Sequence, residues 1–123
     1  MLGTAELVAF VSTRDAAAAR RFYEDALSLP LLEQTPFACV FRAPNAVLRV
    51  TTVNDLVPAA HTVLGWLVAD IEAAARELAA RGIDSIRYPQ LEQDELGIWF
   101  SPSGARVLWF HDPDANVLSL TQS

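Results

Sequence analysis

Asp15-Ala16-Ala17-Ala18-Ala19-Arg20 and Asp70-Ile71-Glu72-Ala73-Ala74-Ala75-Arg76 are the two stretches that decide the fold. Each opens with an aspartate, whose side chain can accept a backbone hydrogen bond at the start of a helix. The alanine-rich residues that follow favour a helix, and each stretch ends on an arginine. The two aspartates lie 55 positions apart in a chain of 123 residues, so an internal duplication is the simplest explanation.

The first half predicts a strand, a helix and three more strands. Alternation over residues 6–11 is typical of a strand and places Glu6, Val8 and Phe10 on one face. Apolar residues at spacings of three and four predict a helix between Asp15 and Pro30. Turn formers separate three further strands, near residues 31–34, 37–41 and 47–53.

The second half repeats this order after a connector at residues 54–58. A strand is expected at residues 62–68, and a helix should run from the Asp70 cap to Gly82. Ile71, Ala74, Ala75 and Leu78 should form the buried face of this helix. Further strands are expected at residues 83–88, 97–101, 107–110 and 117–121. The fold class is therefore α+β, one domain over residues 1–123, with tandem β-α-β-β-β modules at 1–55 and 60–123. Each half would expose one sheet face, so the halves should pack together within the chain or across a dimer.

Composition limits the functional classes. Hydrophobic residues make up 52% of the chain and charged residues 20%, the balance of a folded globular domain. The first residues lack a secretory signal, and the longest nearly apolar run, residues 56–69, is short for a membrane span, so a cytoplasmic protein is expected. The net charge is −6 without a basic run, which argues against nucleic-acid binding. The single cysteine, Cys39, is expected to be a buried structural thiol.

Two features of the chain point to a known family. One is the helix that carries Phe22-Tyr23, and the other is the turn Asp112-Pro113-Asp114-Ala115-Asn116 before the last strand. In both features the chain resembles the vicinal oxygen chelate superfamily. That superfamily includes glyoxalase I, bleomycin-resistance proteins and extradiol dioxygenases. Residues 62–66 and 91–99 are also similar to small bacterial members described only as glyoxalase-like or bleomycin-resistance-like. The resemblance covers nearly the whole chain, and it implies a cupped mixed sheet around a cavity and a homodimer.

The resemblance also implies four metal-ligand positions, one on the first and one on the last strand of each half. On the last strands these positions fall on Arg49 and Ser119. An arginine side chain has only hydrogen-bond donors, and a serine hydroxyl is a weak metal ligand. Neither residue is therefore expected to hold a metal.

On the first strands the register leaves alternatives. The first half gives Glu6 or Val8, and the second gives Val63, with His61 one pleat earlier. Because residues two apart share a face, Glu6 and His61 could both point inward. At most two ligands then remain, fewer than the three usual in a catalytic zinc site. Glu6 could instead form an ion pair with Arg49, although Arg49 could also simply reach solvent at a strand edge.

Aromatic residues offer the other candidate surface. Trp99 and Trp109 could line a pocket or pack in the core, whereas the parity of Trp66 directs it toward the helix. Glu92, Asp94 and Glu95 before Trp99 could hold a cation or form a solvated loop.

These observations favour a metal-free protein that binds a small aromatic or cationic molecule, as bleomycin-resistance relatives do. The expected ligand-binding residues are Glu6, Phe10, Arg49, His61, Trp99 and Ser119. No cofactor motif is present, and His61 is the one candidate for a catalytic base. The alternatives are a metal-dependent lyase, isomerase or dioxygenase that uses Glu6 and His61, and a dimeric scaffold without a ligand.

Overall fold

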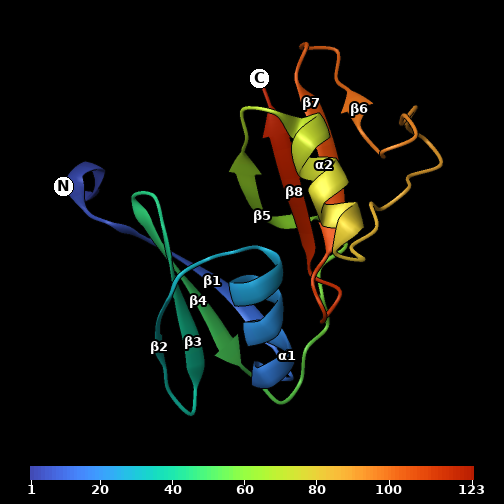
Figure 1. Ribbon diagram of the computed structural model, residues 1–123. Helices are drawn as coiled ribbons and strands as arrows, with labels where there is room; N and C mark the ends of the chain where they lie inside the picture. The colour runs from blue at the N-terminus through green and yellow to red at the C-terminus, as the bar shows by residue number, and fades with distance from the viewer. The chain divides into compact units, whose positions relative to one another are not determined.

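The computed structural model describes all 123 residues as two compact units, Met1–Val57 and Pro58–Ser123. Their boundary falls in the predicted connector. Each unit has one four-stranded mixed sheet with a helical segment against it, as Figure 1 shows. The predicted α+β class and the β-α-β-β-β order of the modules are confirmed in outline. The single domain and the cavity between the halves stay predictions. No helix is both long and apolar enough to cross a membrane.

The first unit follows the predicted order closely. Its elements are η1 (Leu2–Thr4), β1 (Leu7–Thr13), α1 (Ala16–Arg20), η2 (Arg21–Ala26), β2 (Leu31–Gln34), β3 (Ala38–Ala43) and β4 (Ala46–Thr52). The strands lie in the order β1-β4-β3-β2. β1 runs parallel to β4 and the other pairs are antiparallel, so β1 and β2 are the edge strands of this sheet.

The helix of the first unit begins at the predicted cap. The Asp15 carboxylate accepts a hydrogen bond from the amide of Ala18 at 3.1 Å. After Arg20 the helix continues as η2, a π-helix, rather than as a regular α-helix. η2 buries Tyr23 completely, and the Tyr23 ring lies 5.8 Å from that of Phe41 on β3. The helix therefore covers one face of the first sheet.

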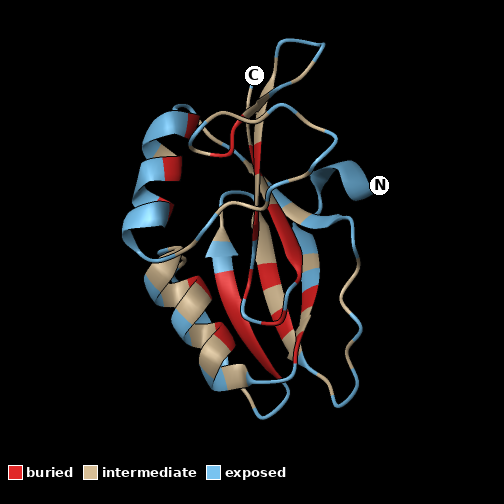
Figure 2. Cartoon of the chain, turned by 90° about the vertical axis from the view of Figure 1, so that its right-hand side faces the viewer, coloured by how far each residue is buried: buried red, intermediate tan, exposed pale blue.

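The second unit contains β5 (Thr62–Leu67), α2 (Ile71–Ala80), β6 (Trp99–Phe100), β7 (Arg106–His111) and β8 (Val117–Gln122). Its strand order is β5-β8-β7-β6. Asp70 caps α2 by accepting from Ala73 N at 3.1 Å, and Gly82 follows the helix with a φ of +77°. The buried stripe of α2, Ile71, Ala75 and Leu78, lies on the predicted face (Figure 2).

The strand expected at residues 83–88 was wrong. Toward β7 this segment makes an isolated bridge between Ser85 and Phe110 and one backbone hydrogen bond, from Ile86 N to Trp109 O at 2.7 Å. The side chain of Gln93 binds Tyr88 N at 2.7 Å and Ile86 O at 2.8 Å. Because a side chain satisfies these backbone groups, the segment does not need a strand ladder and becomes part of a loop.

The turn at residues 112–116 is organised around one buried carboxylate. Asp112 Oδ1 accepts from the amides of Asp114 and Asn116, both at 2.9 Å, and its Oδ2 accepts from Asn116 Nδ2 at 2.8 Å. Ala115 adopts a positive φ of 66° at the tip. The turn sequence that suggested the family therefore has a structural role: it holds the hairpin between β7 and β8.

We expect Asp112→Ala to lower the free energy of unfolding by about 2–4 kcal/mol, because it leaves three buried donors without their acceptor. Chemical denaturation monitored by circular dichroism measures this change. Asp55→Ala, at an exposed position of the connector, is the matched control and should change stability by less than about 0.5 kcal/mol. Equal effects of the two substitutions would contradict the role given to Asp112.

Candidate functional site

The face of each sheet opposite its helix carries the candidate site residues. In the first sheet, Leu48 and Val50 on β4 are buried at 3% and 1% exposure and point toward the helix. Arg49 has the opposite parity and so lies on the other face. The register places it between Phe10 on β1 and Val40 on β3. Two predicted site residues, Phe10 and Arg49, are thus direct neighbours.

The predicted ion pair between Glu6 and Arg49 is wrong. Glu6 lies just before β1 and forms its ion pair with Arg42 of β3, and both side chains are nearly half exposed. The strand predicted near Arg42 ended at residue 41, so the sequence did not indicate Arg42 as the partner of Glu6. The Arg49 guanidinium, which lacks Glu6 as a partner, has no hydrogen bond or ion pair.

The corresponding face of the second sheet carries an aromatic cluster of Tyr88, Trp99 and Trp109. The indole rings of Trp99 and Trp109 lie 5.9 Å apart with an interplanar angle of 34°. Tyr88 meets Trp109 edge-on at 5.2 Å. Trp109 pairs with Ser119 of β8, so the predicted residues Trp99 and Ser119 both adjoin Trp109. Trp66 pairs with the buried Leu120 and points to the helix side, as its parity predicted.

Ser119 lies beside a glycine that leaves room for its hydroxyl. Gly65 of β5 pairs with Ser119, and a Cβ at position 65 would lie only 2.7 Å from Ser119 Oγ. The hydroxyl has no hydrogen-bond partner in the protein. It is therefore free to donate to or accept from a ligand next to the Trp109 indole.

A loop over residues 85–98 positions two members of the aromatic cluster. Besides its bonds to Ile86 and Tyr88, Gln93 donates to Gly97 O at 2.9 Å, and it forms a bridge with Trp99. Gly97 needs its positive φ of 91° and its missing Cβ, since Ser85 Oγ would lie 2.1 Å from that atom. No sequence pattern indicates this role for Gln93, because a glutamine in a polar loop is ordinary.

Asp94 is the acidic residue of this loop whose side chain has a structural role. The Asp94 carboxylate accepts from the amides of Leu96 and Ile98, both at 2.9 Å. Arg87 donates to the carbonyl oxygens of Asp94 and Glu95, the latter at 2.7 Å. These bonds favour the solvated-loop interpretation of the acidic patch over a cation site.

The expectation that His61 points inward depends on strict alternation between His61 and Val63 along the strand. A register shift between Thr62 and Leu64 interrupts that alternation in β5. His61 itself is exposed, lies before the strand, and has no hydrogen bond or ion pair to Trp99 or Ser119. The structure therefore does not bring His61 into the aromatic cluster.

A separate pocket of about 280 Å³ lies on the helix side of the second unit. Leu78 of α2 and Leu108 and Phe110 of β7 contribute apolar surface to it, and Arg87 also lines it. Since Arg87 already donates to two loop carbonyl groups, its guanidinium serves to hold the loop. Asp84, Ser85 and Glu95 are the other polar side chains of this pocket, whereas the two paired indoles lie on the other side of the sheet.

A sequence profile of the Glyoxalase/Bleomycin resistance protein/Dioxygenase superfamily matches residues 6–120, nearly the whole chain. The chain belongs to this superfamily. No curated protein sequence matches the chain. The match confirms the relationship that the Phe22-Tyr23 helix and the turn at residues 112–116 suggested.

Several solved structures share the fold at low sequence identity. A lactoylglutathione lyase from Agrobacterium tumefaciens is 16% identical with a TM-score of 0.77, covering 100% of this chain and 96% of its own. A glyoxalase/bleomycin resistance protein/dioxygenase from Nocardioides is 20% identical with a TM-score of 0.71, covering 95% and 82%. A glyoxalase/bleomycin resistance protein from Catenulispora acidiphila is 18% identical with a TM-score of 0.71, covering 96% and 97%. These similarities establish the fold.

The residues at the ligand positions of this superfamily do not fit a metal. Arg49 and Ser119 stand at two of the positions that the resemblance implies, and Glu6 forms its ion pair with Arg42. His61 lies outside its strand. No group of three or more His, Cys, Asp or Glu side chains is arranged to hold a metal ion. These residues therefore do not supply the three clustered donors of a catalytic metal site.

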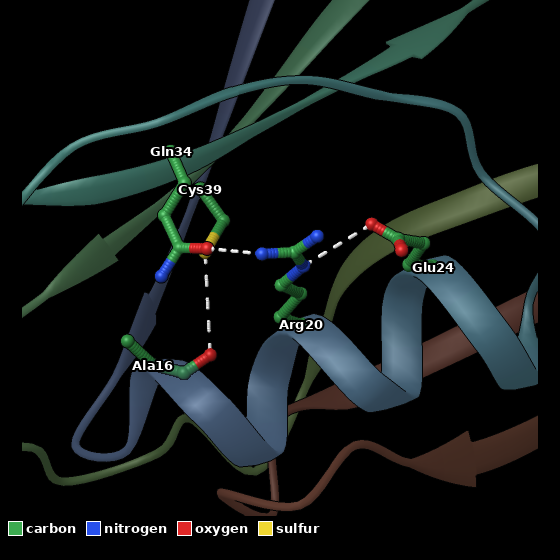
Figure 3. Close-up of polar contacts among 5 residues, drawn as sticks. All are labelled: Ala16, Arg20, Glu24, Gln34 and Cys39. Atoms are coloured by element: carbon green, nitrogen blue, oxygen red, sulfur yellow. Dashed lines mark hydrogen bonds and ion pairs between the residues drawn. The ribbon is translucent and has the colours of Figure 1, made fainter.

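Cys39 is excluded from the chemistry by its burial. Its side chain is buried at 1% exposure and its Sγ faces Ala16 O at 4.0 Å (Figure 3). Nearby, Arg20 links η2 to β2 by donating to Glu24 Oε2 at 3.3 Å and to Gln34 Oε1 at 2.6 Å (Figure 3). Burial raises the pKa of the Cys39 thiol, an effect that Arg20 partly offsets. The thiol is therefore neutral and unreactive at neutral pH, as predicted.

The raised pKa of Cys39 predicts a pH dependence of stability. Above about pH 8.5 the thiol ionises in the unfolded chain while it stays protonated in the folded one, so the free energy of unfolding should fall as pH rises. Below that pH the contribution is constant. Urea denaturation of the native chain and of Cys39→Ala between about pH 7 and pH 10 measures the difference. Identical pH profiles, or rapid reaction of the native thiol with Ellman's reagent, would contradict the assignment.

Proposed function

We propose that this protein binds a small aromatic molecule, without a metal held by the protein, at the aromatic cluster of its second unit. The observation that supports this most directly is the pair of indoles, Trp99 and Trp109, beside the unpartnered Ser119 hydroxyl. Indole faces offer a large apolar contact area with only two side-chain torsions to fix. A single hydroxyl then orients a ligand that carries one polar group.

The geometry favours an aromatic ligand over a cationic one. The tilted indoles and the edge-on Tyr88 present flat surfaces to a planar molecule. The acidic loop that might have attracted a cation uses the Asp94 carboxylate to hold its own backbone. These contacts therefore support an aromatic ligand. The Asp94 carboxylate, which might have attracted a cationic ligand, is used within the loop instead.

Binding without turnover suits the polar groups at this face. Ser119 has no hydrogen bond to a base, so it lacks the activation that a serine nucleophile needs. One solved relative is named a glyoxalase/bleomycin resistance protein, and bleomycin resistance fits a binding role. Another is named a lactoylglutathione lyase. The metal-dependent alternative would need ligands that Arg49 and Ser119 do not supply.

We expect Trp99→Leu to weaken binding of 1-naphthamide, a neutral planar aromatic amide, by about tenfold, because it removes one indole wall. Isothermal titration calorimetry with the full chain measures the affinity. Trp66→Leu is the matched control: the same substitution on the helix side of the same sheet should leave the affinity unchanged.

Two results would contradict this proposal. Equal losses in the Trp99 and Trp66 variants would show that the aromatic cluster does not form the site. A divalent metal bound at one equivalent per purified chain, and lost in Glu6→Ala, would contradict the metal-free binding role and favour the enzyme.

We also propose that the chain forms a homodimer through β1. β1 is an edge strand of its sheet, and Leu7 on it is 66% exposed. An exposed apolar edge strand pairs readily with another chain. Sedimentation should give twice the 13.4 kDa chain mass, and Leu7→Lys should give the monomer. Leu32→Lys, on the opposite edge strand β2, is the control; a monomeric native chain would contradict the proposal.

A further inference from the structure

Arg49 is an unpaired cation in the middle of a sheet face. It lies on β4, between β1 and β3, and is half-buried. Its guanidinium binds no acceptor in the protein, and no buried side-chain nitrogen lacks a partner, so its nitrogens reach solvent. A guanidinium is permanently charged and presents a planar fork of donors. Such a group is ready to bind an anion.

The residues next to Arg49 limit the chemical class of the anion that can bind there. Phe10 lies directly beside Arg49 on β1 with a largely exposed ring, and Val40 lies buried beside it on β3. The flanks of the cation are therefore apolar. An anion that binds there would place an apolar body against Phe10 while its charged group meets the guanidinium.

The local charge favours a monoanion. Arg42, the other arginine on this sheet face, is neutralised by its ion pair with Glu6. A phosphate dianion would need a second cation, whereas one guanidinium matches one carboxylate through two parallel hydrogen bonds. The net charge of −6 also disfavours multiply charged anions.

We infer that Arg49 is a recognition site for the carboxylate of a small aromatic monoanion. The aromatic body is inferred from Phe10 beside Arg49, so this site rests on the first unit alone and is independent of the aromatic cluster in the second. A monoanionic ligand replaces the cationic ligand class expected from the sequence, because the Glu6 carboxylate that would have neutralised Arg49 binds Arg42 instead.

The test compares 1-naphthoate with 1-naphthamide, two probes that differ in charge at one group. Calorimetry on the native full chain should show naphthoate binding at least about tenfold more tightly than naphthamide. Arg49→Gln should remove that preference. The double variant Glu6→Gln/Arg42→Gln, which removes the ion pair on the same face as a neutral unit, should retain it. Arg49→Lys, which keeps the charge and loses the fork, should retain part of it and preserves the test if the glutamine variant is unstable.

The outcomes separate this inference from the proposed function. Naphthoate binding that is lost in Arg49→Gln and unchanged in Trp99→Leu would support the anion site, whatever the affinity for naphthamide. Binding of both probes that depends on Trp99 and is unchanged in Arg49→Gln would support the proposed function and overturn this inference. Equal affinities of the native chain for the two probes, equal losses in the Glu6/Arg42 double variant and the Arg49 variant, or no saturable naphthoate binding at millimolar concentrations would also overturn it.

Discussion

One constraint governs both units: a four-stranded sheet has two faces, and each unit supplies a single helix to cover one of them. The aspartate caps fix where each helix begins, and the apolar stripe behind the cap decides which face is covered. Side chains of opposite parity on the central strands point away from the helix. Arg49, Trp109 and Ser119 all have that parity. The placement of these candidate site residues therefore follows from which face each helix covers.

The second unit shows how side chains can replace a missing strand. Residues 83–88 could have extended the sheet, yet Gln93, Arg87 and Asp94 satisfy the backbone of this region within a loop. The loop determines where two aromatic side chains lie, because it places Tyr88 and Trp99 against the same ring of Trp109. A regular strand would have fixed alternate residues to alternate faces, and this particular cluster would not follow from it. The hydrogen bonds that a strand would have made with its neighbour are thus replaced by side-chain hydrogen bonds within the loop, which hold the aromatic rings in place.

The sequence predicted the parts of the fold that depend on local chemistry. The two caps, the buried stripe of α2, the glycine after it and the side of the sheet that Trp66 occupies all follow from spacing alone. What it could not predict depends on contacts between distant residues or on single-residue irregularities. The partner of Glu6 is set by how β3 extends to residue 43, and the facing of His61 is set by a register shift in β5. Gln93 acts through three backbone groups that no sequence pattern brings together.

Serine and arginine at the two ligand positions that the resemblance implies have different physical consequences. Replacing a metal ligand by serine removes a donor to the metal and leaves a small neutral group, which the adjoining Gly65 accommodates. Replacing a metal ligand by arginine places a permanent positive charge where a neutral or anionic donor would hold a metal cation. A metal in this fold would attract electron-rich oxygen atoms of a substrate as a Lewis acid, and a guanidinium attracts the same atoms by charge and hydrogen bonds. The arginine cannot polarise an oxygen as strongly as a metal, so recognition of an anion can persist where metal-assisted chemistry is lost. Because the Glu6 carboxylate is held by Arg42, that attraction is not cancelled within the sheet, and the charge of Arg49 is available to a ligand.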